Sequence, residues 1–189
     1  MTSYLSPRKE KIMYKITPDY YFYHFYDITV DFLKQNGIES LLCDIDNTLA
    51  PYEEEEPNEA VIEWVKALTE NGIKITLVSN NTEERVTKFI EKLMIPAYFD
   101  ARKPSIEFYV SAMKLIKVPV CRTAVLGDQL LTDGLSAAKL GVRFIMVPPI
   151  NDKKTLFFKA KRTLEAPVMK KFFKDNNIDP SREGTYDWS

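Results

Sequence analysis

Short apolar runs and amphipathic stretches alternate along most of the chain. The apolar runs have the length of buried strands, and between them apolar residues recur at the spacing of helices that end near Gly37, Gly72 and Gly141. This alternation predicts an α/β fold, with a central parallel sheet and helices on both faces joined by right-handed crossovers. The expected strands are 39–45, 73–78, 97–99, 123–126 and 143–147; the expected helices are 28–36, 58–71, 81–93, one after Ser105, and a short one ending near Gly141.

The two ends of the chain do not follow this alternation. Residues 1–16 have the composition of a partly ordered arm, and residues 175–189 that of a frayed tail. Between arm and first helix, residues 20–26 form a dense aromatic patch, Tyr-Tyr-Phe-Tyr-His-Phe-Tyr. The patch suits an N-terminal segment that docks on the core, and also a surface that meets lipid or a partner, since Tyr favours half-wet interfaces. Both interpretations stay open, and His24, the only histidine, is expected to be structural.

Polar side chains follow the strands at the point where each one ends. Asp44 and Asp46 close the most apolar run, and strand alternation places both on the same side of it. Two carboxylates this close repel each other unless a cation shares the site or one of them keeps its proton. The pair therefore indicates a divalent metal, acid/base chemistry or both, although Asp-x-Asp alone is equally typical of a solvated strand end.

Three further clusters follow the later strands. Each has an ordinary structural explanation of its own: a helix cap, a surface loop or a turn. Because carboxyl ends of parallel strands meet at one edge of a sheet, the four clusters together favour a common site there. The three clusters are Ser79 with Asn80, then Lys103, then Asp128 with Asp133.

Composition limits the remaining classes. The chain has 189 residues, enough for one domain with a substantial core, and a net charge of −1, which gives no reason to expect a nucleic-acid partner. Its two cysteines, Cys43 and Cys121, form no disulfide framework or zinc motif. No secretory signal and no apolar run long enough for a bilayer is found, so a reduced, cytoplasmic setting is expected. Four consecutive glutamates, residues 53–56, are expected to form a surface flap and not a metal site.

Taken in order, these motifs resemble the four-motif signature of the haloacid dehalogenase (HAD) superfamily. The matching residues are Asp44-Ile-Asp46-Asn-Thr48, Ser79, Lys103 and Gly127-Asp128 followed by Asp133. The short chain and compact spacing look most like the YqeG-type group of subclass IIIA, related to mitochondrial phosphatases that act on phosphatidylglycerophosphate. The resemblance covers about residues 16–175 and implies a Rossmann-like three-layer HAD fold. We expect residues 1–189 to form a single such domain, with an N-terminal arm and a basic C-terminal segment.

The resemblance also implies a role for each motif residue. Asp44 would be the nucleophile that forms an aspartyl-phosphate, and Asp46 the acid and base that serves the leaving oxygen and the attacking water. Mg²⁺ would be held by Asp44, Asp128 and the backbone carbonyl of Asp46, with Asp133 orienting Lys103 or a metal-bound water. The residues expected at the phosphate are Thr48, Ser79, Asn80 and Lys103.

The spacing between motifs bears on the substrate. Neither interval, Asp46 to Ser79 nor Ser79 to Lys103, has room for a large cap domain, so an open site and a phosphate on a large body are expected. Residues 153–174 interleave lysines and an arginine with four phenylalanines, a pattern typical of an anionic membrane surface. A solvated helix that packs its Phe residues on the core, or an RNA-binding patch, would have the same composition. Peripheral contact with the inner face of the membrane is one hypothesis.

The resemblance favours phosphatidylglycerophosphate as the phosphorylated substrate. Two alternatives stay open: a soluble phosphatase for a sugar phosphate, nucleotide or phosphoprotein, and a regulatory binding protein that retains the phosphatase fold. All motif residues are present, which favours an active enzyme. The sequence carries no indication of oligomeric state.

Overall fold

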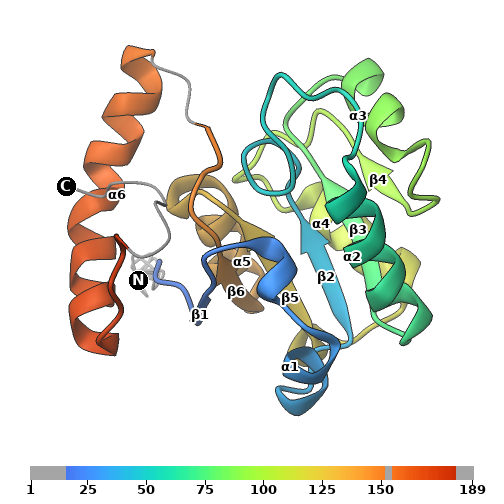
Figure 1. Ribbon diagram of the computed structural model, residues 1–189, viewed down its shortest axis with the longest axis horizontal. Coiled ribbons are helices and arrows are strands. Elements are labelled where there is room, and N and C mark those ends of the chain that lie inside the picture. The colour runs from blue at the N-terminus through green and yellow to red at the C-terminus, as the bar shows by residue number, and fades with distance from the viewer. Residues whose placement is uncertain (1–15, 152–154, 182–189) are drawn as a thin grey trace, which may run out of the picture.

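The computed structural model describes residues 16–151 and 155–181. These residues form one six-stranded parallel sheet in the order β1-β6-β5-β2-β3-β4 (Figure 1). The five predicted strands are all present, and the predicted α/β class with a central parallel sheet is confirmed. The strands are β1 (Tyr20–Tyr21), β2 (Ser40–Cys43), β3 (Lys74–Val78), β4 (Ala97–Tyr98), β5 (Thr123–Gly127) and β6 (Arg143–Met146).

Strand β2 lies in the middle of the sheet, paired with β3 on one side and β5 on the other. From β2 the chain builds outward through β3 and β4, then returns to add β5 and β6 on the opposite side. All four residues of β2 are buried, as expected of a strand covered on both faces. This reversal of strand order at β2 is the place where open α/β sheets form ligand sites, just beyond the carboxyl ends of the strands.

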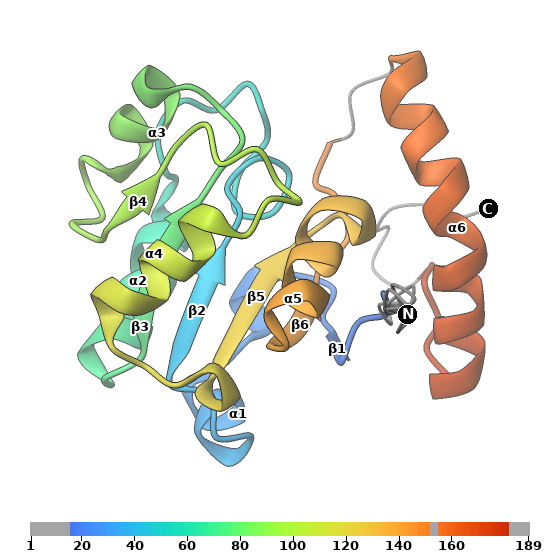
Figure 2. The ribbon, with the colours of Figure 1, turned by 180° about the vertical axis from the view of Figure 1, so that it is seen from behind.

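Helices cover both faces of the sheet. One apolar core lies against α1, α2 and α3 (Figure 1), and the other lies against α4, α5 and part of α6, with α4 and α5 nearest the viewer in Figure 2. In the described residues, only a loop and α2 separate β2 from β3, and only α3 separates β3 from β4, so no large cap is present there. The helices are α1 (Val30–Gln35), α2 (Glu59–Glu70), α3 (Glu83–Ile90), α4 (Glu107–Ile116), α5 (Leu135–Leu140) and α6 (Leu156–Asn176), with short turns η1 (Phe25–Asp27), η2 (Val120–Arg122) and η3 (Leu130–Gly134).

The aromatic segment near the N-terminus docks on the core, as one of its two interpretations predicted. Tyr20 and Tyr21 form the edge strand β1 beside β6, a strand the sequence pattern did not predict. Phe25 is buried, its ring 5.3 Å edge-on from that of Trp64 on α2. The strand is two residues long, and its pairing is set by β6 and not by any periodicity of its own. Most of the predicted N-terminal arm lies outside the described residues.

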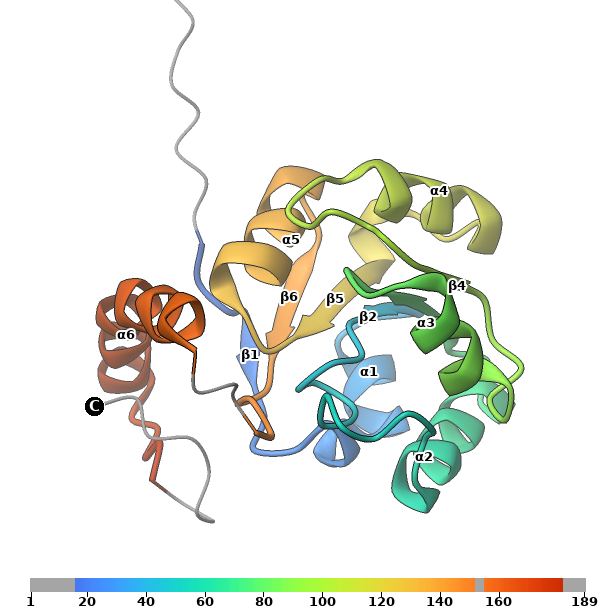
Figure 3. The ribbon, with the colours of Figure 1, turned by 90° about the horizontal axis from the view of Figure 1, so that it is seen from above.

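Helix α6 resolves the basic and aromatic pattern near the C-terminus. It stands outside the β1 edge of the sheet (Figures 1 and 3), and it buries Met169 and Phe173 against the second core. Lys159, Lys170, Lys171 and Lys174 remain exposed. Phe173 therefore does not share a surface with the lysines, and the packed-helix interpretation is favoured. Lys153, Lys154 and the side chain of Phe157 lie outside the described part of the chain.

Candidate active site

Asp44 continues strand β2 at the floor of the site. Its backbone N–H donates to the carbonyl of Leu126 on β5 at 2.9 Å, which extends the ladder by one residue and fixes the direction of the side chain. The carboxylate is 6% exposed, and its Oδ1 lies 2.5 Å from Nζ of Lys103, which is also buried. Asp44 and Lys103, more than fifty residues apart in sequence, thus form a direct ion pair.

Asn80 holds the loop that carries Lys103. Its Oδ1 accepts from the Lys103 backbone N–H at 2.6 Å, and its Nδ2 donates to the Lys103 carbonyl at 3.4 Å. Both ends of the amide are therefore engaged with the backbone of one residue. Asn80 lines the pocket, as expected of a phosphate-site residue, but its visible contacts position the lysine.

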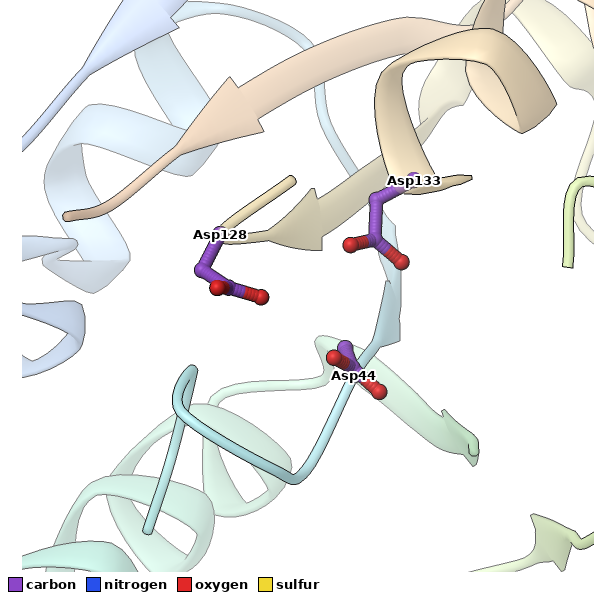
Figure 4. A group of neighbouring side chains, drawn as sticks. All are labelled: Asp44, Asp128 and Asp133. Atoms are coloured by element: carbon purple, nitrogen blue, oxygen red, sulfur yellow. The ribbon is translucent and has the colours of Figure 1, made fainter. Parts of the chain in front are cut away.

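Asp128 and Asp133 reach the same place from the loop and turn that follow β5 (Figure 4). One carboxylate oxygen each from Asp44, Asp128 and Asp133 lies within 4.8 Å of the others. Oδ1 of Asp133 accepts from Lys103 Nζ at 2.8 Å, and its Oδ2 accepts from the Thr132 hydroxyl at 3.2 Å. Asp133 packs so closely against Gly127 that no side chain fits at that position, which explains the glycine before Asp128.

The charges of this cluster do not balance. Burial raises the pKa of Asp44 well above its usual value. Lys103 opposes this rise, and Asp133, Asp128 and Asp46 add to it. Burial alone would lower the pKa of Lys103, but Asp133 and Asp44 together raise it. The Lys103 ammonium is shared by two carboxylates, and the Arg162 guanidinium that binds the third is itself shared with Glu165, so the group keeps a net negative charge. The donors are all oxygens, three of them carboxylates, and this set fits a hard divalent cation such as Mg²⁺.

Asp46 is held apart from this cluster by a different set of donors. Asn81 Nδ2 lies 3.1 Å and the Ser79 hydroxyl 3.4 Å from its Oδ2, and Arg85 NH2 donates to its Oδ1 at 3.3 Å. The helix predicted over 81–93 begins two residues later than expected, at Glu83. Thr82 is the N-cap, its side chain accepting from the Arg85 N–H, and so the Asn81 amide reaches Asp46.

Arg85 was missed because nothing in the four motifs marks it. It lies in the first turn of α3, and its NH1 also donates to the carbonyl of Glu55 at 3.0 Å. Lys88, further along the helix, pairs with Glu55, and Lys92, just after the helix ends, pairs with Glu56. The exposed acidic flap is therefore tied to the helix that carries Arg85. The feature of the sequence that could have indicated Arg85 is a basic helix face that follows an acidic loop.

Thr48 lies beside Asp128 of the acidic cluster. Its hydroxyl is buried and donates to Asp128 Oδ1 at 3.4 Å. The Asn47 that precedes it adopts a left-handed conformation, φ 64°, which turns the chain sharply after Asp46.

Two residues of α6 also belong to the site, and sequence analysis missed both. Arg162 NH2 lies 2.5 Å from Asp128 Oδ2, and its NH1 donates to the Asp128 carbonyl at 2.8 Å. NH1 also donates to Glu165 Oε2 at 2.9 Å, and Glu165 Oε1 accepts from the Leu131 N–H at 3.0 Å. Burial raises the pKa of Glu165, with Arg162 opposing. Arg162 was counted among the surface charges of a basic segment, but it is 5% exposed.

Four of the predicted site residues, Asp44, Asp46, Asn80 and Lys103, line a pocket of about 280 Å³. Asp44, Asp46 and Lys103 form its buried floor, whereas half-buried Tyr52 and Phe158 stand at its rim. Asn80, Asn81, Gln129, Thr132 and Lys161 complete the lining. The predicted site residues are thus gathered at one place, at the carboxyl edge of β2, β3, β4 and β5.

Comparisons with known proteins agree with this geometry. A family model described as haloacid dehalogenase-like hydrolase matches residues 25–147, about two thirds of the chain. The chain belongs to this family. It is also 34% identical over 152 residues to a curated protein of Bacillus subtilis named "Probable phosphatase YqeG", covering 80% of this chain and 88% of that protein. The predicted superfamily and enzyme class, a HAD-type phosphatase, are confirmed by these two findings.

A solved structure of low identity shares the fold. A hypothetical protein of Xanthomonas campestris aligns with a TM-score of 0.50 and 17% identity, covering 68% of this chain and 73% of that one. A subfamily III A HAD hydrolase of Legionella pneumophila aligns with a TM-score of 0.42 and 21% identity, covering 51% and 59%. No helix among the described residues is long and apolar enough to cross a membrane.

Proposed function

We propose that the protein is a Mg²⁺-dependent phosphomonoester hydrolase that works through an aspartyl-phosphate on Asp44, with phosphatidylglycerophosphate as the favoured substrate. The observation that carries the proposal is the floor of the pocket. There, Asp44 is paired with Lys103, two further carboxylates lie within 4.8 Å, and Asp46 is held separately by Arg85.

In the first step a carboxylate oxygen of Asp44 attacks the phosphorus while the bond to the ester oxygen breaks. Asp46 gives its proton to that oxygen, which leaves as an alcohol. A water molecule then attacks the phosphorus, Asp46 takes its proton, and the acyl-phosphate bond breaks to free Asp44 and inorganic phosphate. Lys103 offsets the charge of the phosphoryl oxygens throughout. Asp44, Asp128 and the backbone carbonyl of Asp46 would hold Mg²⁺, which adds Lewis-acid stabilisation of the phosphoryl charge.

The substrate proposal rests on the similarity to the YqeG-type group and on the open site without a large cap. The cavity of about 280 Å³ is just below the usual range for small-molecule pockets, about 300–1,000 Å³, and suits a headgroup whose acyl chains stay outside. Peripheral membrane contact would use the exposed face of α6, where Leu156 and Leu164 accompany Lys159, Lys170, Lys171 and Lys174. We further propose that residues 1–189 make up a single phosphatase domain.

The test is phosphate release from a substrate panel in Mg²⁺. Phosphatidylglycerophosphate in detergent micelles is compared with sugar phosphates, nucleotides and a phosphopeptide. Turnover of the lipid far above that of every soluble ester supports the full proposal. Preference for a soluble ester removes the lipid assignment, and no turnover of any ester, in a protein that is folded and loaded with Mg²⁺, rejects the hydrolase.

A further inference from the structure

Helix α6 forms one wall of the pocket, although the family match ends before it begins. Two consecutive residues of this helix contact two consecutive residues of the loop after β5. Arg162 donates to the carboxylate of Asp128, and Lys161 Nζ donates to Oε1 of the neighbouring Gln129 at 3.3 Å. The buried Arg162–Glu165 pair fixes the position of α6 along the loop after β5. Because Lys161 precedes Arg162 in the same helix, this contact also holds Lys161 at the pocket.

The residues that line the pocket differ in burial between its floor and its rim. Asp44, Asp46 and Lys103 are buried, whereas Tyr52, Phe158 and Lys161 are half-buried. The transferring phosphoryl group must meet Asp44 at the floor. Whatever it is attached to must therefore extend toward the rim, where the residues of α6 lie.

The rim has an aromatic and a cationic part. The rings of Tyr52 and Phe158 meet edge to face with centroids 5.9 Å apart, and Lys161 Nζ lies 5.8 Å from the centroid of Phe158. The two aromatic rings can pack against an aliphatic part of the substrate, and an ammonium beside them can bind an anion at the far end of that part. At the floor, the ammonium of Lys103 lies between the carboxylates of Asp44 and Asp133.

We propose that Phe158 and Lys161 form a leaving-group subsite that selects phosphomonoesters of short aliphatic alcohols carrying a second anionic group, a phosphate or phosphodiester. This proposal rests on the proposed phosphatase function and adds the chemistry of the leaving group. Helix α6 then discriminates between substrates, a task performed by an inserted cap in larger relatives. The same chemistry is found in a lipid headgroup and in a soluble bisphosphate.

The experiment compares propane-1,3-diol bisphosphate with 3-hydroxypropyl phosphate, which differ only in the second phosphate. Wild type, Lys161→Gln and the control Lys159→Gln, an exposed lysine of the same helix, are assayed for kcat and KM. A charge-assisted contact contributes about 1.5–3 kcal/mol, so wild type should prefer the bisphosphate by about 10- to 100-fold in kcat/KM. Lys161→Gln should erase most of this preference through KM, and Lys159→Gln should keep it.

A parallel assay with phosphatidylglycerophosphate micelles separates the two sources. A Lys161→Gln defect in the micelle assay alone assigns the second anion to a lipid headgroup, and a defect with the soluble bisphosphate alone assigns it to a small metabolite. Equal losses on both soluble esters would place Lys161 at the transferring phosphoryl group and overturn the subsite. The subsite is also overturned if the wild type shows no preference for the bisphosphate and Lys161→Gln hydrolyses the micellar lipid as well as the wild type does. Hydrolysis of none of the three substrates overturns the subsite, whereas the phosphatase itself is rejected only if the wider panel also shows no turnover.

Discussion

Arg162 of α6 and Asp128 of the loop after β5 form a buried pair in which the guanidinium binds both the side chain and the backbone carbonyl of the aspartate. Asp128 is fully buried, its other carboxylate oxygen accepts from Thr48, and the residue belongs to the acidic cluster. The arginine therefore helps to fix the orientation of a proposed metal ligand.

Replacing Arg162 should destabilise the protein strongly. Arg162→Met leaves Glu165 and Asp128 buried without their cation, and breaking a buried pair from one side costs about 3–5 kcal/mol. The double variant Arg162→Met with Glu165→Gln should lose less, because the amide keeps an acceptor for the Leu131 N–H without a charge. Urea unfolding in EDTA and in Mg²⁺ measures both, and the loss should be smaller in Mg²⁺. Equal losses for single and double variants would contradict a coupled pair.

Asp44→Asn should abolish hydrolysis and leave the fold intact. The amide is nearly isosteric with the carboxylate but is not a nucleophile, so kcat should fall more than about a thousandfold. Phosphate release measures the activity, and circular dichroism checks the fold. Beryllofluoride, which mimics a phosphoryl group on a carboxylate, should stabilise the wild type and not the variant. Retained turnover would remove Asp44 from its assigned role.

The raised pKa of Asp44 predicts that stability without metal falls as pH rises. An unfolded aspartate titrates near 3.9, so above this pH the folded state holds the proton that the unfolded state has lost. The free energy of unfolding therefore decreases with pH up to the folded pKa. Thermal melting in EDTA should show this slope in the wild type and in the exposed-site control Glu63→Gln, and a flatter one in Asp44→Asn. Identical slopes in all three proteins would refute the assignment.

Metal affinity should separate Asp128 from Asp133. In the proposed arrangement Asp133 orients Lys103, whose Nζ lies 2.8 Å from its Oδ1, so Asp133→Asn should weaken Mg²⁺ binding by about 10- to 100-fold, as loss of an orienting partner does. Asp128→Asn removes a direct ligand and should weaken it further. Isothermal titration with Mg²⁺ measures both, and EDTA should abolish activity in the wild type. A tighter site in Asp128→Asn than in Asp133→Asn would reverse the two roles.

Binding to anionic vesicles should be weak and sensitive to salt. Phe173 is buried, so contact would rest mainly on exposed lysines, each contributing about 1 kcal/mol near an anionic surface. Cosedimentation with anionic vesicles should be lost in Lys170→Glu/Lys171→Glu, with neutral lipids and with added salt, which screens exposed charges. Wild type that fails to sediment with either lipid at low salt would end the membrane proposal and favour a soluble phosphoester.

The sequence predicted what depends on local pattern and on strand ends. Asp44, Ser79, Lys103 and Asp128 follow apolar runs, and parallel strands bring such positions to one edge. Contacts that depend only on tertiary packing could not be predicted from the sequence in this way. Arg85 and Arg162 occur on helices in ordinary polar contexts, and only the docking of α3 and α6 reveals that they meet Asp46 and Asp128. The two-residue strand β1 was missed for the same reason.

The anchoring of α6 has a consequence for synthesis of the chain. Every carboxylate of the acidic cluster has been made once Asp133 leaves the ribosome, but the wall that carries Phe158, Lys161 and Arg162 comes later. Until then Asp128 lacks the guanidinium that binds it in the folded protein. A chain interrupted before α6 would therefore contain every carboxylate of the cluster but would lack the partner that neutralises Asp128, the apolar side chains that α6 buries, and the proposed leaving-group subsite.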